Sequence, residues 1–147
     1  QALKYINTKK SLRKPPEINF SSHLKINNFV YKIIRKYEIN SIHDISEGGL
    51  MVAISESCFN PNNNIGAKIN PKLLGLKNNL ALFAESQGCY ILSTSKNQAG
   101  KIKSYATKNN INVTVIGEVG GDSLILEDTF KIKIDALFKI WNGGFPS

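Results

Sequence analysis

Two short segments carry most of the side chains in this sequence that could do chemistry. The first, 43–50, reads His-Asp-Ile-Ser-Glu-Gly-Gly-Leu, so polar side chains are followed by a pair of glycines. Glycines at the start of a helix let a ligand or another backbone approach closely, and the free N–H groups of the first turn favour an anion. We interpret this segment as a candidate phosphate-binding helix start, which Ser46 or Asp44 could cap. The plainer alternative is a capped helix start whose glycine pair serves packing alone.

The second segment, 83–90, reads Phe-Ala-Glu-Ser-Gln-Gly-Cys-Tyr. Three hydrogen-bonding side chains, Glu85, Ser86 and Gln87, precede Gly88 and an apolar stretch. Serine and glutamine can donate to phosphate oxygens or to a ribose, and glycine gives the turn conformational freedom. The alternative is an ordinary polar turn. We expect the two segments to converge, because each ends a strand or opens a helix beside the same sheet.

Apolar periodicity predicts the elements that position these segments. Ile26, Val30, Ile33, Ile34 and Tyr37 recur at helical spacing and predict a helix from Ser22 onward. Further helices are predicted over 50–58, 97–108 and 136–141, and strands over 41–45, 65–69, 89–93, 113–119, 123–126 and 130–134. The last two strands are close enough to form a hairpin. The pattern predicts an α/β (α+β) domain with a mixed sheet and helices packed against it.

Residues 1–22 are expected to be a lead-in or linker, because Pro15-Pro16 excludes regular helix there. Residues 23–147 are expected to form a single domain, since a chain of this length can bury a full core. The sequence begins at Gln1 without a methionine, which suggests a fragment of a longer protein.

The net charge of +8 invites a nucleic-acid interpretation. Only Arg13 and Arg35 are arginines, however, against 17 lysines that are scattered along the chain. Arginine is the residue that forks onto phosphate and guanine, so we expect no nucleic-acid partner.

Cys58 and Cys89 lie far apart in the sequence, and the chain has only two histidines. The short, paired ligand spacings of a structural zinc site are therefore missing. Isolated thiols fit a reducing compartment. No run of about 18 apolar residues and no signal-peptide pattern occurs. We expect a cytoplasmic protein without a membrane partner.

Common catalytic signatures are missing from the sequence, including GxxxxGK[ST], HExxH and GxGxxG. His43 and Asp44 do not form a triad, because neighbours on a strand point to opposite faces. No catalytic residue is therefore assigned to this chain.

Taken in order, several segments resemble the C-terminal domain type of aminoimidazole ribonucleotide synthetase and its relatives. Within that superfamily, 43–50 resembles the HDxSDGGL motif of the phosphoribosylformylglycinamidine synthase family, with Glu47 in place of Asp. Residues 82–88 resemble its LFxESQGR loop, with Cys89 where the motif has Arg. The VTVIGEVGG stretch at 113–121, the closing Trp141-Asn142-Gly143 and the early Pro15-Pro16-Glu17 resemble further landmarks of that family.

The resemblance implies a four-domain parent chain of which this is the last domain. It implies an ATP-dependent C–N ligase of purine biosynthesis, which converts formylglycinamide ribonucleotide, ATP and glutamine-derived ammonia to formylglycinamidine ribonucleotide. The isolated fragment is expected to be inactive. The implied cofactors are ATP or ADP and Mg²⁺. The implied partners are the upstream domains of the same chain, a glutaminase, a small accessory subunit and a small-molecule nucleotide.

In that family this domain is the pseudo-symmetric counterpart of the copy that contacts substrate. The resemblance implies Asp44 as a candidate Mg²⁺ ligand and a phosphate- or nucleotide-binding pseudo-site formed by His43, Ser46, Gly48, Gly49, Glu85, Ser86, Gln87 and Gly88. Cys89 cannot pair with phosphate as arginine does, so we expect a weak grip. The alternatives are a related synthetase, for aminoimidazole ribonucleotide or selenophosphate, and a structural scaffold with no ligand.

Overall fold

Two β-sheets organise the described part of the chain, which comprises residues 20–60, 64–74, 82–85 and 88–143 of a computed structural model. In the first sheet β1 (Ser41–Asp44) pairs antiparallel with β3 (Tyr90–Ser93). The second sheet has the strand order β4 (Gly117–Val119), β2 (Ala67–Ile69), β5 (Ser123–Leu126) and β6 (Phe130–Lys133). Strands β2 and β5 are parallel and the other pairs antiparallel, so the predicted mixed sheet is confirmed.

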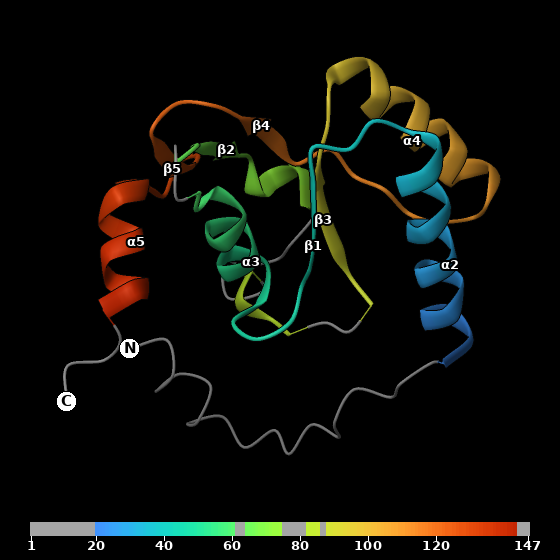
Figure 1. The fold of residues 1–147 in the computed structure, drawn as a ribbon, viewed down its shortest axis with the longest axis horizontal. Coiled ribbons are helices and arrows are strands. Elements are labelled where there is room, and N and C mark those ends of the chain that lie inside the picture. Colours follow the sequence, from blue (N-terminus) through green and yellow to red (C-terminus); the bar gives the residue numbers. More distant parts are fainter. Residues whose placement is uncertain (1–19, 61–63, 75–81, 86–87, 144–147) are drawn as a thin grey trace.

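Helices flank both sheets (Figure 1). Helices α2 (Phe20–Lys36) and α4 (Lys96–Lys108) lie side by side next to β1 and β3. Helix α3 (Gly49–Cys58) directly follows β1, and α5 (Ile134–Gly143) directly follows the β5–β6 hairpin. A short 3₁₀ helix, η1 (Pro71–Leu74), follows β2. The chain between β1 and α3 therefore has only a short turn in which to place the first candidate segment.

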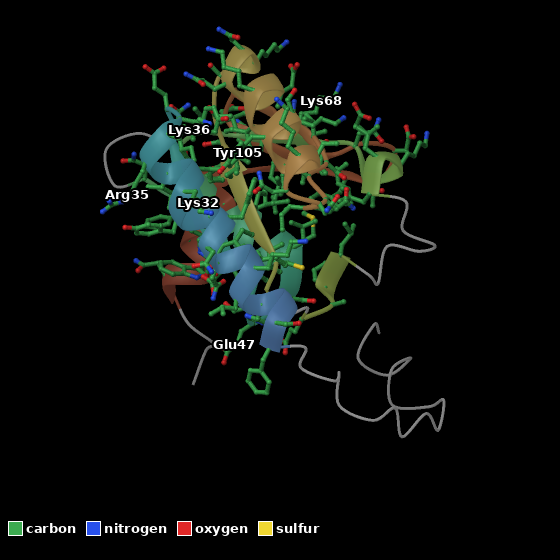
Figure 2. The ribbon with its side chains drawn as sticks, turned by 90° about the vertical axis from the view of Figure 1, so that its right-hand side faces the viewer. Lys32, Arg35, Lys36, Glu47, Lys68 and Tyr105 are labelled. Carbon is green, nitrogen blue, oxygen red and sulfur yellow. The ribbon has the colours of Figure 1, made fainter. Side chains whose placement is uncertain are left out.

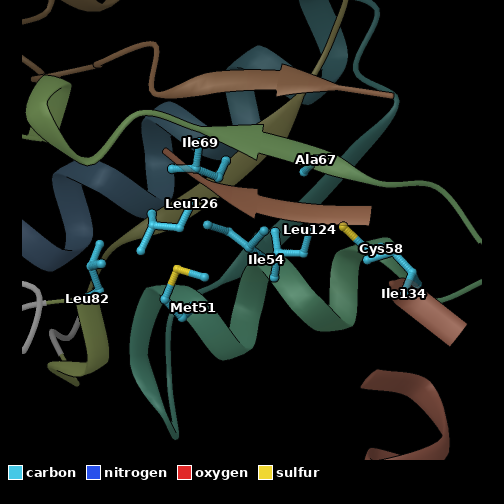
Figure 3. Packing of buried hydrophobic residues seen from close by; sticks show 9 residues of the cluster. All are labelled: Met51, Ile54, Cys58, Ala67, Ile69, Leu82, Leu124, Leu126 and Ile134. Carbon is cyan, nitrogen blue, oxygen red and sulfur yellow. The ribbon is translucent and has the colours of Figure 1, made fainter. Parts of the chain in front are cut away.

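Two apolar clusters hold the elements together. The larger one joins α3 to the four-stranded sheet (Figure 3) and consists of Met51, Ile54, Cys58, Ala67, Ile69, Leu82, Leu124, Leu126 and Ile134. The smaller one joins α2 to α4 through Phe29, Ile33, Ile102 and Ala106. Full burial of one such large apolar side chain contributes about 1.5–3 kcal/mol. The larger cluster therefore fixes α3, and with it the turn that precedes α3.

The predicted elements are present, with shifted ends. Helix α2 begins at Phe20, inside the segment predicted as a lead-in, and the strand predicted over 113–119 is confined to Gly117–Val119. Ile34 was assigned to the inward face of its helix, but it is 50% exposed and Phe29 is buried instead. The Pro15-Pro16 segment lies outside the described residues, so the boundary between lead-in and domain stays a prediction. Among the helices that the structure describes, none is long and apolar enough to cross a membrane.

Candidate functional site

The two candidate segments meet where β1 runs into α3. Because β1 and β3 are antiparallel neighbours, the end of β1 lies beside the start of β3, and Asp44 is opposite Tyr90. The N–H of Ile45 donates to the carbonyl oxygen of Cys89 over 2.8 Å. The N–H of Gly48 donates to Oε1 of Glu85 over 3.1 Å. The predicted convergence is confirmed for these residues, whereas Ser86 and Gln87 lie outside the described part of the chain.

The glycine pair is required by both backbone conformation and space. Gly48 and Gly49 have φ angles of 75° and 72°, in the left-handed region that side chains rarely adopt. A Cβ on Gly49 would lie 2.6 Å from the carbonyl carbon of Phe83 and 2.9 Å from the carbonyl oxygen of Ala84. A Cβ on Gly48 would collide with Val52. The expected close approach of another backbone is thus confirmed, and that backbone is the one that leads into Glu85.

Neither Ser46 nor Asp44 caps α3, which corrects the expectation from sequence. The N-cap residue is Gly48, with no side-chain cap. Ser46 instead accepts the N–H of Gly49 through its backbone oxygen over 3.2 Å. The reason is that the glycine pair adds a turn between Ser46 and the helix. The carboxylate of Glu85 takes the place of a cap, and a negative charge there is favoured by the helix dipole.

His43 is held by two acceptors rather than pointing freely at a ligand. Its Nδ1 donates to the carbonyl oxygen of Asp44 over 2.6 Å, and its Nε2 lies 3.1 Å from Oε2 of Glu56. Glu56 was not identified from sequence, because nothing in its spacing shows that the second half of α3 packs back on β1.

A hollow of about 460 Å³ opens beside the contact between His43 and Glu56, between α3 and α5. Besides His43 and Glu56 it is lined by Phe59, Phe138 and Trp141. The three rings pack on one another, with centroids 5.4 Å apart for the two pairs that include Phe59 and 6.1 Å apart for Phe138 and Trp141. The ring contacts join the end of α3 to α5, so the hollow is a consequence of how the two helices meet.

Asp44 offers a single exposed carboxylate at the end of β1, 3.9 Å from Nδ1 of His43. In the ranges that the structure describes, no three histidine, cysteine, aspartate or glutamate side chains gather to hold a metal ion. Mg²⁺ is commonly held by one or two carboxylates together with substrate phosphates and waters. Asp44 fits that mode, in which a nucleotide brings the remaining oxygens.

Helix α2 braces the second segment from the other side. Gly88 has a φ of 72°, and a Cβ there would lie 3.2 Å from Nε2 of His23. The hydroxyl of Tyr90 donates to Oδ1 of Asn27 over 2.9 Å. Neither contact has a signal in the sequence, because each joins residues more than 60 positions apart. Gly88 and Tyr90 therefore contact α2, whereas Glu85 contacts the start of α3.

Comparison with known families and proteins gives a consistent result. The family described as "AIR synthase related protein, C-terminal domain" matches residues 8–128. A phosphoribosylformylglycinamidine synthase subunit PurL from Bartonella tribocorum is 30% identical over 90% of this chain, and one from Bartonella henselae is 32% identical over the same share. One from Pelagibacter ubique is 33% identical over 85% of this chain. The chain spans only 17–18% of the length of these three relatives.

Two solved structures share the fold. Thermotoga maritima PurL complexed with FGAR superposes with a TM-score of 0.67 at 18% identity, over 78% of this chain and 20% of that one. The complex of T. maritima PurL with AMPPCP gives 0.64 at 19% identity, over 77% of this chain and 21% of that one. At this identity the likeness establishes the α/β fold that the sequence predicted.

Proposed function

The chain belongs to the family of AIR synthase related proteins, C-terminal domain, and from this premise we propose that it is the last domain of a phosphoribosylformylglycinamidine synthase. The observation that carries the proposal is the alignment of PurL subunits over 90% of the chain. The contact between Gly49 and the Phe83–Ala84 backbone supports it, because it ties together the two segments that resemble motifs of that synthase. The related synthetases of the superfamily are less favoured, because the relatives named above are all PurL subunits.

The proposed parent enzyme activates an amide with ATP. The formylglycinamide oxygen is phosphorylated, and ammonia from a glutaminase displaces the phosphate to give the amidine. A bound Mg²⁺ offsets phosphate charge in such transfers, and Asp44 is the residue of this chain that would hold it. The proposal also includes three kinds of partner, which are the upstream domains of the same chain, a glutaminase and a small accessory subunit. It further includes a cytoplasmic location.

Within the parent, we assign this domain a supporting role with a weak phosphate site. The candidate donors are the N–H groups of the α3 start, the side chains of His43 and Ser46, and those of Ser86 and Gln87, which lie outside the described residues. Two features reduce their grip: the Glu85 carboxylate already accepts the N–H of Gly48, and Cys89 cannot fork onto phosphate as arginine does. The scaffold without a ligand is the second candidate, and the same two features favour it.

Calorimetric titration of ADP and Mg²⁺ into the chain separates these two roles. One charge-assisted contact is worth about 1.5–3 kcal/mol, or about one to two decades of affinity. We expect dissociation constants in the high-micromolar range, and Cys89→Arg should tighten binding. Submicromolar binding by the unaltered chain would contradict the weak site, and no binding by either protein would favour the scaffold.

The proposed function itself is tested by replacement. The aligned region of B. henselae PurL is exchanged for this chain, and the formation of ADP from ATP, formylglycinamide ribonucleotide and ammonia is measured. We expect the chimera to be active and the 147-residue chain alone to be inactive. Gly49→Ala should abolish the activity of the chimera, whereas Gly100→Ala, in open space on α4, should preserve it. A folded but inactive chimera would count against the proposed function, as would turnover by the pure chain.

A further inference from the structure

Helix α2 carries two apolar faces, of which its own domain uses one. At about 100° per residue, Phe29 and Ile33 point toward α4 and are buried. The opposite face, which we call the outer stripe, consists of Phe20, Leu24, Tyr31 and Ile34, with exposures of 78%, 65%, 57% and 50%. A large apolar stripe left in water by a folded domain marks a surface that another molecule or domain covers.

Basic side chains flank the outer stripe on one side. Lys32, Arg35 and Lys36 lie along the C-terminal half of α2 (Figure 2). Lys25, in the N-terminal half, donates from Nζ to the carbonyl oxygen of Asn110 over 3.1 Å. Within the described ranges no ion pair joins Lys32, Arg35 or Lys36 to a carboxylate. Lysines elsewhere do have such partners; Lys68, for example, lies 3.0 Å from Glu127. Arg35 lies over the ring of Tyr31 and Lys36 over the ring of Tyr105, so these cations have aromatic contacts but no described carboxylate partner. Their charge beside the stripe favours a partner surface rimmed with Asp and Glu.

The stripe is continuous with the candidate site. Asn27 lies within the stripe and accepts the hydroxyl of Tyr90, the first residue of β3. His23 borders the stripe and lies against Gly88, and its Nε2 is buried without a hydrogen-bond partner among the described residues. A partner seated on the stripe would therefore press on the two residues of α2 that contact Gly88 and Tyr90.

We propose that the outer stripe of α2 is the docking surface for another domain of the same longer polypeptide, one that presents an apolar strip edged by carboxylates. This inference rests on the proposed function. About four-fifths of the length of the PurL relatives lies outside the region that matches this chain, so most of such a protein is available to cover the stripe. The docking contact would also hold Gly88 and Tyr90 in place through His23 and Asn27.

The test uses the chimera with B. henselae PurL and the double substitution Leu24→Glu and Tyr31→Glu. Both side chains are more than half exposed, so circular dichroism should show that the isolated chain still folds. In the chimera the substitution should lower the rate of ADP formation by about tenfold or more, as loss of an interface hot spot does. Val115→Glu, at a site that is 52% exposed and outside α2, is the control and should stay within about twofold.

Hydrogen exchange provides a readout that does not depend on activity. Amides of residues 20–36 should exchange about tenfold more slowly in the chimera than in the isolated chain, and the double substitution should remove that difference. Equal exchange in the chimera and the isolated chain would overturn the docking inference even if the chimera is active. An inactive chimera with a protected α2 would instead count against the proposed function alone.

A second copy of the chain or a membrane surface on the outer stripe would give different experimental results. Concentration-dependent doubling of the mass of the isolated chain, lost in the double variant, would assign the stripe to a second copy and overturn the inference. Binding of the chimera to vesicles that contain phosphatidylserine, lost in the same variant, would assign it to a membrane surface and overturn the inference as well.

Discussion

Two pairs of adjacent glycines stand at turns of this domain, and their surroundings are opposite. Gly48-Gly49 lies at the start of α3, Gly120-Gly121 lies between β4 and β5, and all four residues have positive φ angles. A Cβ on Gly49 would lie 2.6 Å from the backbone of Phe83, whereas a Cβ on Gly120 or Gly121 would meet nothing within 4 Å. A pair of adjacent glycines is thus required for tight packing in the first turn, whereas in the second turn it only allows the chain to reverse direction.

At the second turn the tight contact is made by Gly66, which stands directly before β2 and opposite the glycine pair. The N–H of Gly66 donates to the carbonyl oxygen of Gly121, and the N–H of Gly120 donates to that of Gly66, each over 2.8 Å. A Cβ on Gly66 would lie 2.6 Å from the backbone nitrogen of Ser123. The solitary glycine is therefore the packed one there, and a glycine pair by itself does not locate a crowded or functional site.

The largest effect is expected for Gly49→Ala. Left-handed backbone costs an alanine about 1–2 kcal/mol and an overpacked contact another 1–3, so the free energy of unfolding should fall by about 2–5 kcal/mol. Urea unfolding of the isolated chain, followed by circular dichroism, measures the change. Gly100→Ala is the control and should gain about 0.5–1 kcal/mol, because its Cβ would meet nothing and alanine favours helix. A loss below about 1 kcal/mol in Gly49→Ala would show that this turn is as open as the other.

The far end of α3 should respond to alkali. Burial raises the pKa of the Cys58 thiol from 9.0 to about 11. At a pH between these two pKa values, the unfolded chain has lost the thiol proton and the folded chain still keeps it. The contribution of this thiol to the free energy of unfolding is therefore fully present below pH 9.0 and is lost as the pH rises toward about 11. The loss attributable to this thiol should reach about 2–3 kcal/mol.

Unfolding curves at several alkaline pH values, for the unaltered chain and for two variants, isolate that contribution. Cys58→Ala should have a shallower alkaline decline, although it is less stable at neutral pH. Cys89→Ala, at the exposed thiol, should keep the decline of the unaltered chain. If the free energy of unfolding falls equally with pH in all three proteins, the Cys58 thiol is not buried from water. That result would weaken the contrast between the packed α3 region and the open turn.

Gly121→Ala tests the open turn directly. Only the backbone term applies there, since φ is 75° and no atom is near the added methyl group, so a loss of about 1–2 kcal/mol is expected. Asparagine tolerates this conformation better than alanine does, so Gly121→Asn should recover part of the loss. The comparison between the two glycine pairs fails if Gly121→Ala is as damaging as Gly49→Ala in the same urea titration.

The smallest effect is expected for Glu85→Gln. The amide oxygen can still accept the N–H of Gly48, so only the interaction of the charge with the start of α3 is lost. For an exposed group this is worth about 0.3–1 kcal/mol at low salt and is screened at high salt. Unfolding at low and high ionic strength should show a difference between variant and unaltered chain that shrinks with salt. A salt-independent loss would mean that the geometry of the bond, rather than its charge, holds the turn.

Local pattern was enough to predict α3 and the late hairpin, which depend on periodicity and on turn residues within a few positions of one another. The convergence of the two candidate segments joins residues 37 positions apart and was predicted from topology, because each segment ends a strand or opens a helix beside the same sheet. The pairing of His43 with Glu56 could not be predicted, because it depends on the angle at which α3 packs on β1. The same holds for the bracing of Gly88 by His23. The prediction that Ile34 faces inward was wrong for a different reason. Helix α2 has apolar residues on two faces, and the hydrophobic period alone does not say which face the domain buries.

The pairing of β2 with β5 has a consequence for how the chain acquires its shape during synthesis. Ala67 lies opposite Leu124, so the two central strands of the four-stranded sheet come from distant parts of the sequence. On a ribosome β2 emerges long before either β4 or β5, and it has to wait with its apolar residues exposed until they follow. Contacts between remote segments also slow folding in general. The four-stranded sheet can therefore close only after β5 has been synthesised, and a chain that ends before β5 leaves β2 without its parallel partner.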